Sequence, residues 1–136
     1  MEAGGVICSI DLNGYAYPDG AGPDSNWVRG LLIVTAGGVR VERPFLTLVS
    51  AMPAWVTSLT QFTYSPGEGV VLSNTEDDFE IELRHVGGDL QGEVRTQLSD
   101  GLVGSFRMAF PLTLDAVDML RVGLEEATWV YPERAS

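Results

Sequence analysis

Five carboxylates gather in the stretch NTEDDFEIE at residues 74–82, the densest group of potentially reactive side chains in the chain. They are Glu76, Asp77, Asp78, Glu80 and Glu82. Carboxylates this close together can hold a calcium ion or work as an acid/base pair. The stretch lacks the regular oxygen-ligand spacing and the central glycine of a calcium loop. We therefore expect these residues to form either a solvated face or an acidic patch that contacts another protein.

The chain has one histidine, His85, and one cysteine, Cys8. A catalytic nucleophile needs a base close to it. His85 stands beside the Gly87-Gly88 turn, however, and Cys8 alternates with polar neighbours as a buried apolar residue does. Two such residues cannot complete a structural zinc site. The glycines at 37–38 and 87–88 fall in predicted hairpin turns, whereas a phosphate site needs them at a helix N-terminus. The sequence predicts no catalytic residue, no metal and no cofactor.

The net charge of −11, from 19 acidic residues against 8 arginines, limits the classes of partner. An acidic surface repels nucleic-acid phosphate and anionic lipid, so we expect no direct binding to nucleic acid or membranes. Acidity can equally serve solubility alone. No apolar run is long enough to span a bilayer and no secretory signal opens the chain, so we expect a cytoplasmic protein. The length of 136 residues suits a single domain over residues 1–136.

Apolar and polar residues alternate along several short segments, the pattern of strands with one buried face. Such strands are predicted at 7–14, 27–35, 39–42, 70–73, 79–86, 90–98 and 103–110. The Gly87-Gly88 turn joins the fifth and sixth of these into a hairpin. Pro44 should interrupt the third strand or place it at a sheet edge, because proline cannot donate to a ladder.

Two segments have helical periodicity instead. The first follows Ser50, a candidate N-cap, and its apolar stripe is Met52, Trp55, Val56 and Leu59. The second is capped by Thr113 and should end before Pro132. The order is three strands, a helix, four strands and a helix, with no internal repeat. We expect an α+β fold with a mainly antiparallel sheet of about six to seven strands and two helices packed on one face.

The stretch YAYPDGAGPDSNW at residues 15–27 combines two prolines and two glycines with aromatic residues at both ends. Proline fixes φ and glycine adopts conformations that other residues avoid, which indicates a shaped loop. One interpretation is structural: Tyr15, Tyr17 and Trp27 anchor a bend, and Asp24 and Asn26 bond the local backbone. The other is that the loop presents Tyr17 and Asp24 to a partner.

Four motifs then stand in a suggestive order: GYAYPDGAGPDSNWVRGLLIV, ERPFLTL, AWVTSL on the first predicted helix, and YPER after the last. Together they resemble the WapI family of bacterial immunity proteins over nearly the whole chain. The residues that carry the likeness are Tyr15, Pro18, Asp24, Asn26, Trp27, Pro44, Leu46, Thr47, Trp55, Pro132 and Arg134. Two departures are SNTEDDF, in place of an expected glutamate-proline pair, and Val56 in place of leucine.

The resemblance implies a cytoplasmic antitoxin that binds and blocks the toxin domain of a wall-associated or contact-delivered toxin, often a nuclease. An acidic inhibitor suits a basic nuclease site, because complementary potential speeds association. We expect contact through the five carboxylates of residues 76–82, with Tyr17 and Asp24 from the loop. The alternatives are a non-catalytic domain that binds a small molecule or serves as an assembly subunit, and a hydrolase built on carboxylates.

Overall fold

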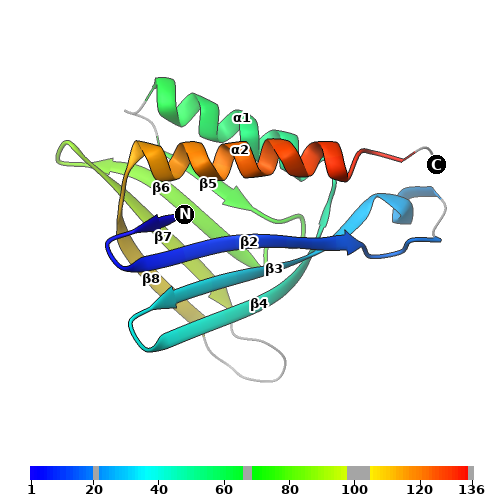
Figure 1. Cartoon of the computed structure of the whole chain (residues 1–136), viewed down its shortest axis with the longest axis horizontal. Helices are drawn as coiled ribbons and strands as arrows, with labels where there is room; N and C mark the ends of the chain where they lie inside the picture. The colour runs from blue at the N-terminus through cyan, green and yellow to red at the C-terminus, as the bar shows by residue number, and fades with distance from the viewer. Residues whose placement is uncertain (20–21, 66–68, 98–104, 135–136) are drawn as a thin grey trace.

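The computed structural model describes residues 1–19, 22–65, 69–97 and 105–134, and Figure 1 shows their arrangement. The first sheet has the strand order β1-β2-β3-β4 and the second β5-β6-β7-β8, and all neighbours are antiparallel. The strands of the first are Glu2–Ala3, Val6–Tyr15, Trp27–Ala36 and Val39–Leu48. Those of the second are Val70–Ser73, Phe79–Val86, Asp89–Gln97 and Ser105–Leu112.

A helix follows each sheet: α1, Ala51–Tyr64, and α2, Leu114–Val130. The two helices contact each other and lie side by side on one side of the molecule (Figure 1). Thr113 caps α2, since its side chain accepts from the Ala116 N–H at 3.1 Å, whereas Ser50 occupies the N-cap of α1 without a side-chain bond. Neither helix is long and apolar enough to cross a membrane.

The predicted α+β, antiparallel architecture with two helices is confirmed, and its strands divide into two sheets. The chain builds one pattern twice, four strands and then a helix, although the sequence shows no repeat. Strand β1 was not predicted, because two residues are too few to show alternation. The third predicted strand extends through Pro44, which lies on edge strand β4 as expected. Leu98 and residues 103–104, placed in predicted strands, lie outside the described residues.

In each sheet, a glycine of the third strand lies opposite a phenylalanine of the fourth. Gly30 pairs with Phe45 in the first sheet, and Gly92 pairs with Phe110 in the second. A Cβ on Gly30 would lie 2.3 Å from the Phe45 ring, and one on Gly92 would lie 2.6 Å from the Phe110 ring. Each aromatic ring therefore covers a backbone position that only glycine can leave open.

The inner faces of the two sheets and one face of each helix form the core. Phe45 of the first sheet meets Phe79 of the second edge-on, with ring centroids 4.9 Å apart. Trp55 of α1 lies 6.3 Å from the Phe79 ring and donates its indole N–H to the Ser73 carbonyl at 2.9 Å. The predicted stripe of α1 is buried apart from Val56, which is half-buried, and Phe62 extends it.

A buried amide joins the sheets at one end. Asn74 is 2% exposed, and its Nδ2 donates to the Leu46 carbonyl of β4 and to an Asp78 carboxylate oxygen. Its Oδ1 accepts from the backbone N–H groups of Asp78 and Phe79. Asp78 in turn pairs with Arg43 of β4 at 2.9 Å. The turn before β6 is thus tied to the edge of the first sheet.

The loop after β2 is tied to the C-terminal segment. The Tyr15 hydroxyl donates to the Pro132 carbonyl at 2.6 Å, and the Arg134 guanidinium lies 3.8 Å from the Tyr15 ring centroid. Arg134 also donates to the carbonyls of Tyr17 and Pro18. The prediction that Asn26 bonds the local backbone is wrong, because its side chain exchanges two hydrogen bonds with the Arg134 backbone. This loop therefore has a structural role in closing the fold.

We predict that Asn74→Ala destabilises the protein by about 2–4 kcal/mol, because it leaves the Leu46 carbonyl and two N–H groups without partners. The free energy of unfolding in urea measures this loss. Asn13→Ala, which truncates an exposed amide on β2, is the control and should cost less than about 0.5 kcal/mol. Equal effects of the two changes would contradict the role of Asn74.

Candidate functional site

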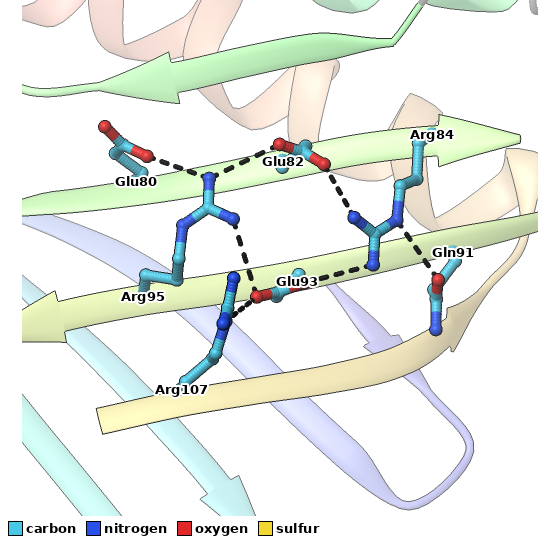
Figure 2. Close-up of polar contacts among 7 residues, drawn as sticks. All are labelled: Glu80, Glu82, Arg84, Gln91, Glu93, Arg95 and Arg107. Atoms are coloured by element: carbon cyan, nitrogen blue, oxygen red, sulfur yellow. Dashed lines mark hydrogen bonds and ion pairs between the residues drawn. The ribbon is translucent and has the colours of Figure 1, made fainter. Parts of the chain in front are cut away.

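The outer face of the second sheet carries alternating charges in place of a purely acidic patch (Figure 2). Three glutamates, Glu80, Glu82 and Glu93, lie among three arginines, Arg84, Arg95 and Arg107. Arg95 reaches Glu80 at 2.8 Å and Glu82 at 3.3 Å, and Arg84 reaches Glu82 at 2.9 Å. Because opposite charges balance in number, this face contributes little net potential.

Glu93 is the centre of this network. Its side chain is 6% exposed and is contacted by Arg84 at 3.0 Å, Arg95 at 3.4 Å and Arg107. The hydrogen bond from Arg107 and the charges of all three arginines lower the pKa of Glu93 from its ordinary value of 4.5. A carboxylate so enclosed costs free energy unless it is paired, and here three cations compensate it.

The structure separates the acidic residues that the sequence placed in one contact patch. Glu80 and Glu82 are ion-paired on the sheet, and the Asp78 carboxylate is bonded to Asn74 and Arg43. Only Glu76 and Asp77 are exposed in the turn, where Asp77 has a φ of 56°. The sequence could not show this, because the arginines that neutralise Glu80 and Glu82 come partly from β7.

Tyr17 and Asp24 are exposed on the loop between β2 and β3, and Tyr17 is 47% accessible. This loop and the turn before β6 are bonded to two neighbouring residues, Leu48 and Val49. The Val49 N–H donates to the Asn26 carbonyl, and the Leu48 N–H donates to the Thr75 hydroxyl. Tyr17, Asp24, Glu76 and Asp77 therefore lie toward one end of β4. Their role in binding stays a prediction.

Cys8 is buried, and His85 is half-buried. Cys8 is 1% exposed, and burial raises the pKa of its thiol to about 11, as expected for a core residue. The His85 ring lies 5.7 Å from the Phe62 ring, and its Nε2 is buried without a hydrogen-bond partner among the described residues. Within those residues, no cluster of three His, Cys, Asp or Glu side chains could hold a metal ion.

A groove of about 1210 Å³ between β2 and α2 was missed by the sequence analysis. In Figure 1 the red and orange helix α2 runs above the blue strand β2. The sequence analysis gave only the limits of α2, whose inward stripe consists of Ala116, Val117 and Leu124. Met119 and Val130 line the groove, lie off that stripe and are 75% and 63% exposed. Large apolar residues on the second face of a helix were the available signal.

Carboxylates line this groove together with apolar side chains. Glu2, Asp11, Asp115 and Glu126 are all exposed, and no ion pair joins any of them to another described residue. The positive group in the lining is the N-terminal ammonium of Met1, which donates to the Cys8 carbonyl at 2.6 Å. The groove therefore carries negative charge that the protein itself does not neutralise.

The immunity protein WapI-like family has a model that matches residues 1–129. The chain belongs to this family. Membership supports an immunity role, in which a protein counters a toxin, and the predicted resemblance is confirmed. Several motif residues of the family resemblance meet in the contact between the loop and the C-terminal segment, where Tyr15 and Asn26 bind the backbone around Pro132 and Arg134. The last two lie beyond the matched range.

Two of the solved structures that match this chain cover most of its length. The plant transcriptional regulator PBF-2 has a TM-score of 0.54 at 9% identity, with 96% of this chain and 79% of that chain covered. MRP1/MRP2 of Trypanosoma bruciei gives a TM-score of 0.46 at 10% identity, with 93% and 86% covered. At 9% identity the likeness to PBF-2 shows the fold alone. No curated protein matches this WapI-like chain in sequence.

We predict a pH-dependent effect of Glu93→Gln. Because the pKa of Glu93 is lowered in the folded state, its carboxylate stabilises the protein above the ordinary value of 4.5, and this contribution is lost as the pH falls through the folded-state pKa. The wild type should therefore exceed the variant in urea midpoint at pH 7, and the difference should vanish in acid. Glu76→Gln is the exposed control, and a difference for Glu93→Gln that is constant with pH would contradict this account.

Proposed function

We propose that this protein is an antitoxin that acts in the cytoplasm by binding and covering a cognate toxin domain, without turning over a substrate. The observation that carries the proposal is the immunity protein family match over residues 1–129. Inhibition by covering requires only a stable complementary surface. The single core shared by the two sheets and the two helices supports such a surface, because a preformed surface loses less conformational entropy on binding.

We further propose that the toxin domain is basic, as in a nuclease that holds phosphate. Six of the eight arginines are in ion pairs: Arg40, Arg43, Arg84, Arg95, Arg107 and Arg121. Arg134 is engaged with backbone carbonyls. Few cations are left to offset the other carboxylates, so the exterior has a strongly negative potential. Such a potential can raise association from about 10⁵–10⁶ toward 10⁸–10⁹ M⁻¹s⁻¹ at low salt.

A macromolecular partner is also favoured over a small ligand. The α2–β2 groove of about 1210 Å³ exceeds the roughly 300–1,000 Å³ of typical small-molecule pockets. It is lined by carboxylates and exposed apolar side chains together. Those features suit a segment of a protein that carries both positive charge and apolar side chains.

We predict that co-expression with the toxin-like C-terminal domain encoded beside this protein restores growth of cells that the toxin otherwise arrests. The purified pair should elute as one complex, and raising the salt concentration should slow its association. A toxin domain from an unrelated system is the control. The proposal fails if no adjacent product is neutralised, or if the purified protein turns over a substrate and one side-chain change abolishes that turnover.

A further inference from the structure

We propose that the α2–β2 groove receives an extended, basic and apolar segment of the toxin domain, which pairs as an added strand with the free edge of β2. This inference rests on the proposed antitoxin function and names the surface that would perform it. It differs from the surface that the sequence suggested, the carboxylates of residues 76–82.

The edge of β2 is unpaired along most of the groove. Strand β1 covers only Val6 and Ile7 of β2, and no other described strand lies on that side. Beyond this pairing, Met1 and Cys8 exchange two backbone hydrogen bonds of 2.7 and 2.6 Å. The unpaired part of an edge strand offers backbone N–H donors and C=O acceptors to another chain.

The backbone of Ile10 points into the groove. The backbone N–H and C=O groups of every second residue in a strand point to the same edge. Cys8 bonds Met1 on that side, and the Leu12 carbonyl accepts from the Tyr131 hydroxyl of the segment after α2 at 3.4 Å. Ile10 lies between them, so its N–H and C=O face the space between β2 and α2. An incoming strand would continue the line of β1.

The side chains around this edge define the chemistry of the segment. Glu2 lies on β1, Asp11 lies on β2, and Asp115 and Glu126 lie on α2. Ile7, Met119 and Val130 add apolar surface that is 45%, 75% and 63% exposed. Arginine or lysine alternating with apolar residues would meet both kinds of surface. A second copy of this chain would bring the same carboxylates and no lysine, so charge complementarity favours a basic partner.

Gly123 is a separate indication that something approaches α2 here. It lies in the middle of α2 and lines the groove, and a Cβ at this position would meet nothing within 4 Å. Its φ is not positive, so neither backbone geometry nor internal packing requires glycine. Glycine in a helix interior is unfavourable relative to other residues. Close approach of a partner backbone would account for its presence.

The test uses the full chain and the cognate toxin domain found by co-expression. Gly123→Gln should leave the melting temperature unchanged or raised, because glutamine is a better helix former, and should weaken the complex by about tenfold or more. Asp11→Asn with Glu126→Gln should slow association by about tenfold at low salt and flatten its salt dependence. Glu76→Gln with Asp77→Asn removes the same charge outside the groove, and should change the dissociation constant by less than about twofold.

Hydrogen exchange supplies the test of strand pairing. The Ile10 amide should exchange rapidly in the free protein and become protected in the complex. Full affinity of the two groove variants, or an unprotected Ile10 amide in the complex, would overturn the inference while the antitoxin function stands. A dimer of the free protein that Gly123→Gln dissociates would assign the groove to a second copy, and would also overturn it. Failure to neutralise any adjacent toxin would instead remove the function on which the inference rests.

Discussion

The nearly buried carboxylate of Glu93 constrains how charge is distributed over this protein. A carboxylate in that position needs compensation, and Arg84, Arg95 and Arg107 supply it. The same arginines also hold Glu80 and Glu82. With eight cations in the whole chain, this use of three leaves most other carboxylates unbalanced. The outer face of the second sheet is therefore close to neutral, and the negative potential lies elsewhere.

The uncompensated carboxylates meet exposed apolar surface beside α2. The inner face of that helix completes the core through Val117 and Leu124, and its outer residues leave a groove against β2. Because β1 covers only the first residues of β2, the groove also contains an open sheet edge. Charge, apolar area and backbone hydrogen-bonding groups thus coincide in one place. That coincidence distinguishes the groove from the turn at Glu76 and Asp77, which offers charge alone.

Local patterns in the sequence predicted most of the fold. Alternation identified the strands around Gly87-Gly88, and Thr113 and Pro132 marked the limits of α2. The division into two sheets could not be predicted in this way, because it depends on long-range contacts such as Phe45 with Phe79 and Asn74 with Leu46. The site was harder still. Whether a carboxylate is free depends on which arginine lies across the ladder, and the partner of Glu80 is 15 residues away in sequence.

A structure of the complex with the cognate toxin domain tests the central claim most directly. This account predicts that a basic segment of the toxin lies between β2 and α2 and bonds the backbone of Ile10, with the ion-paired face around Glu93 left in solvent. A toxin docked on the face of Glu80, Glu82 and Arg95, with the groove empty, would contradict it.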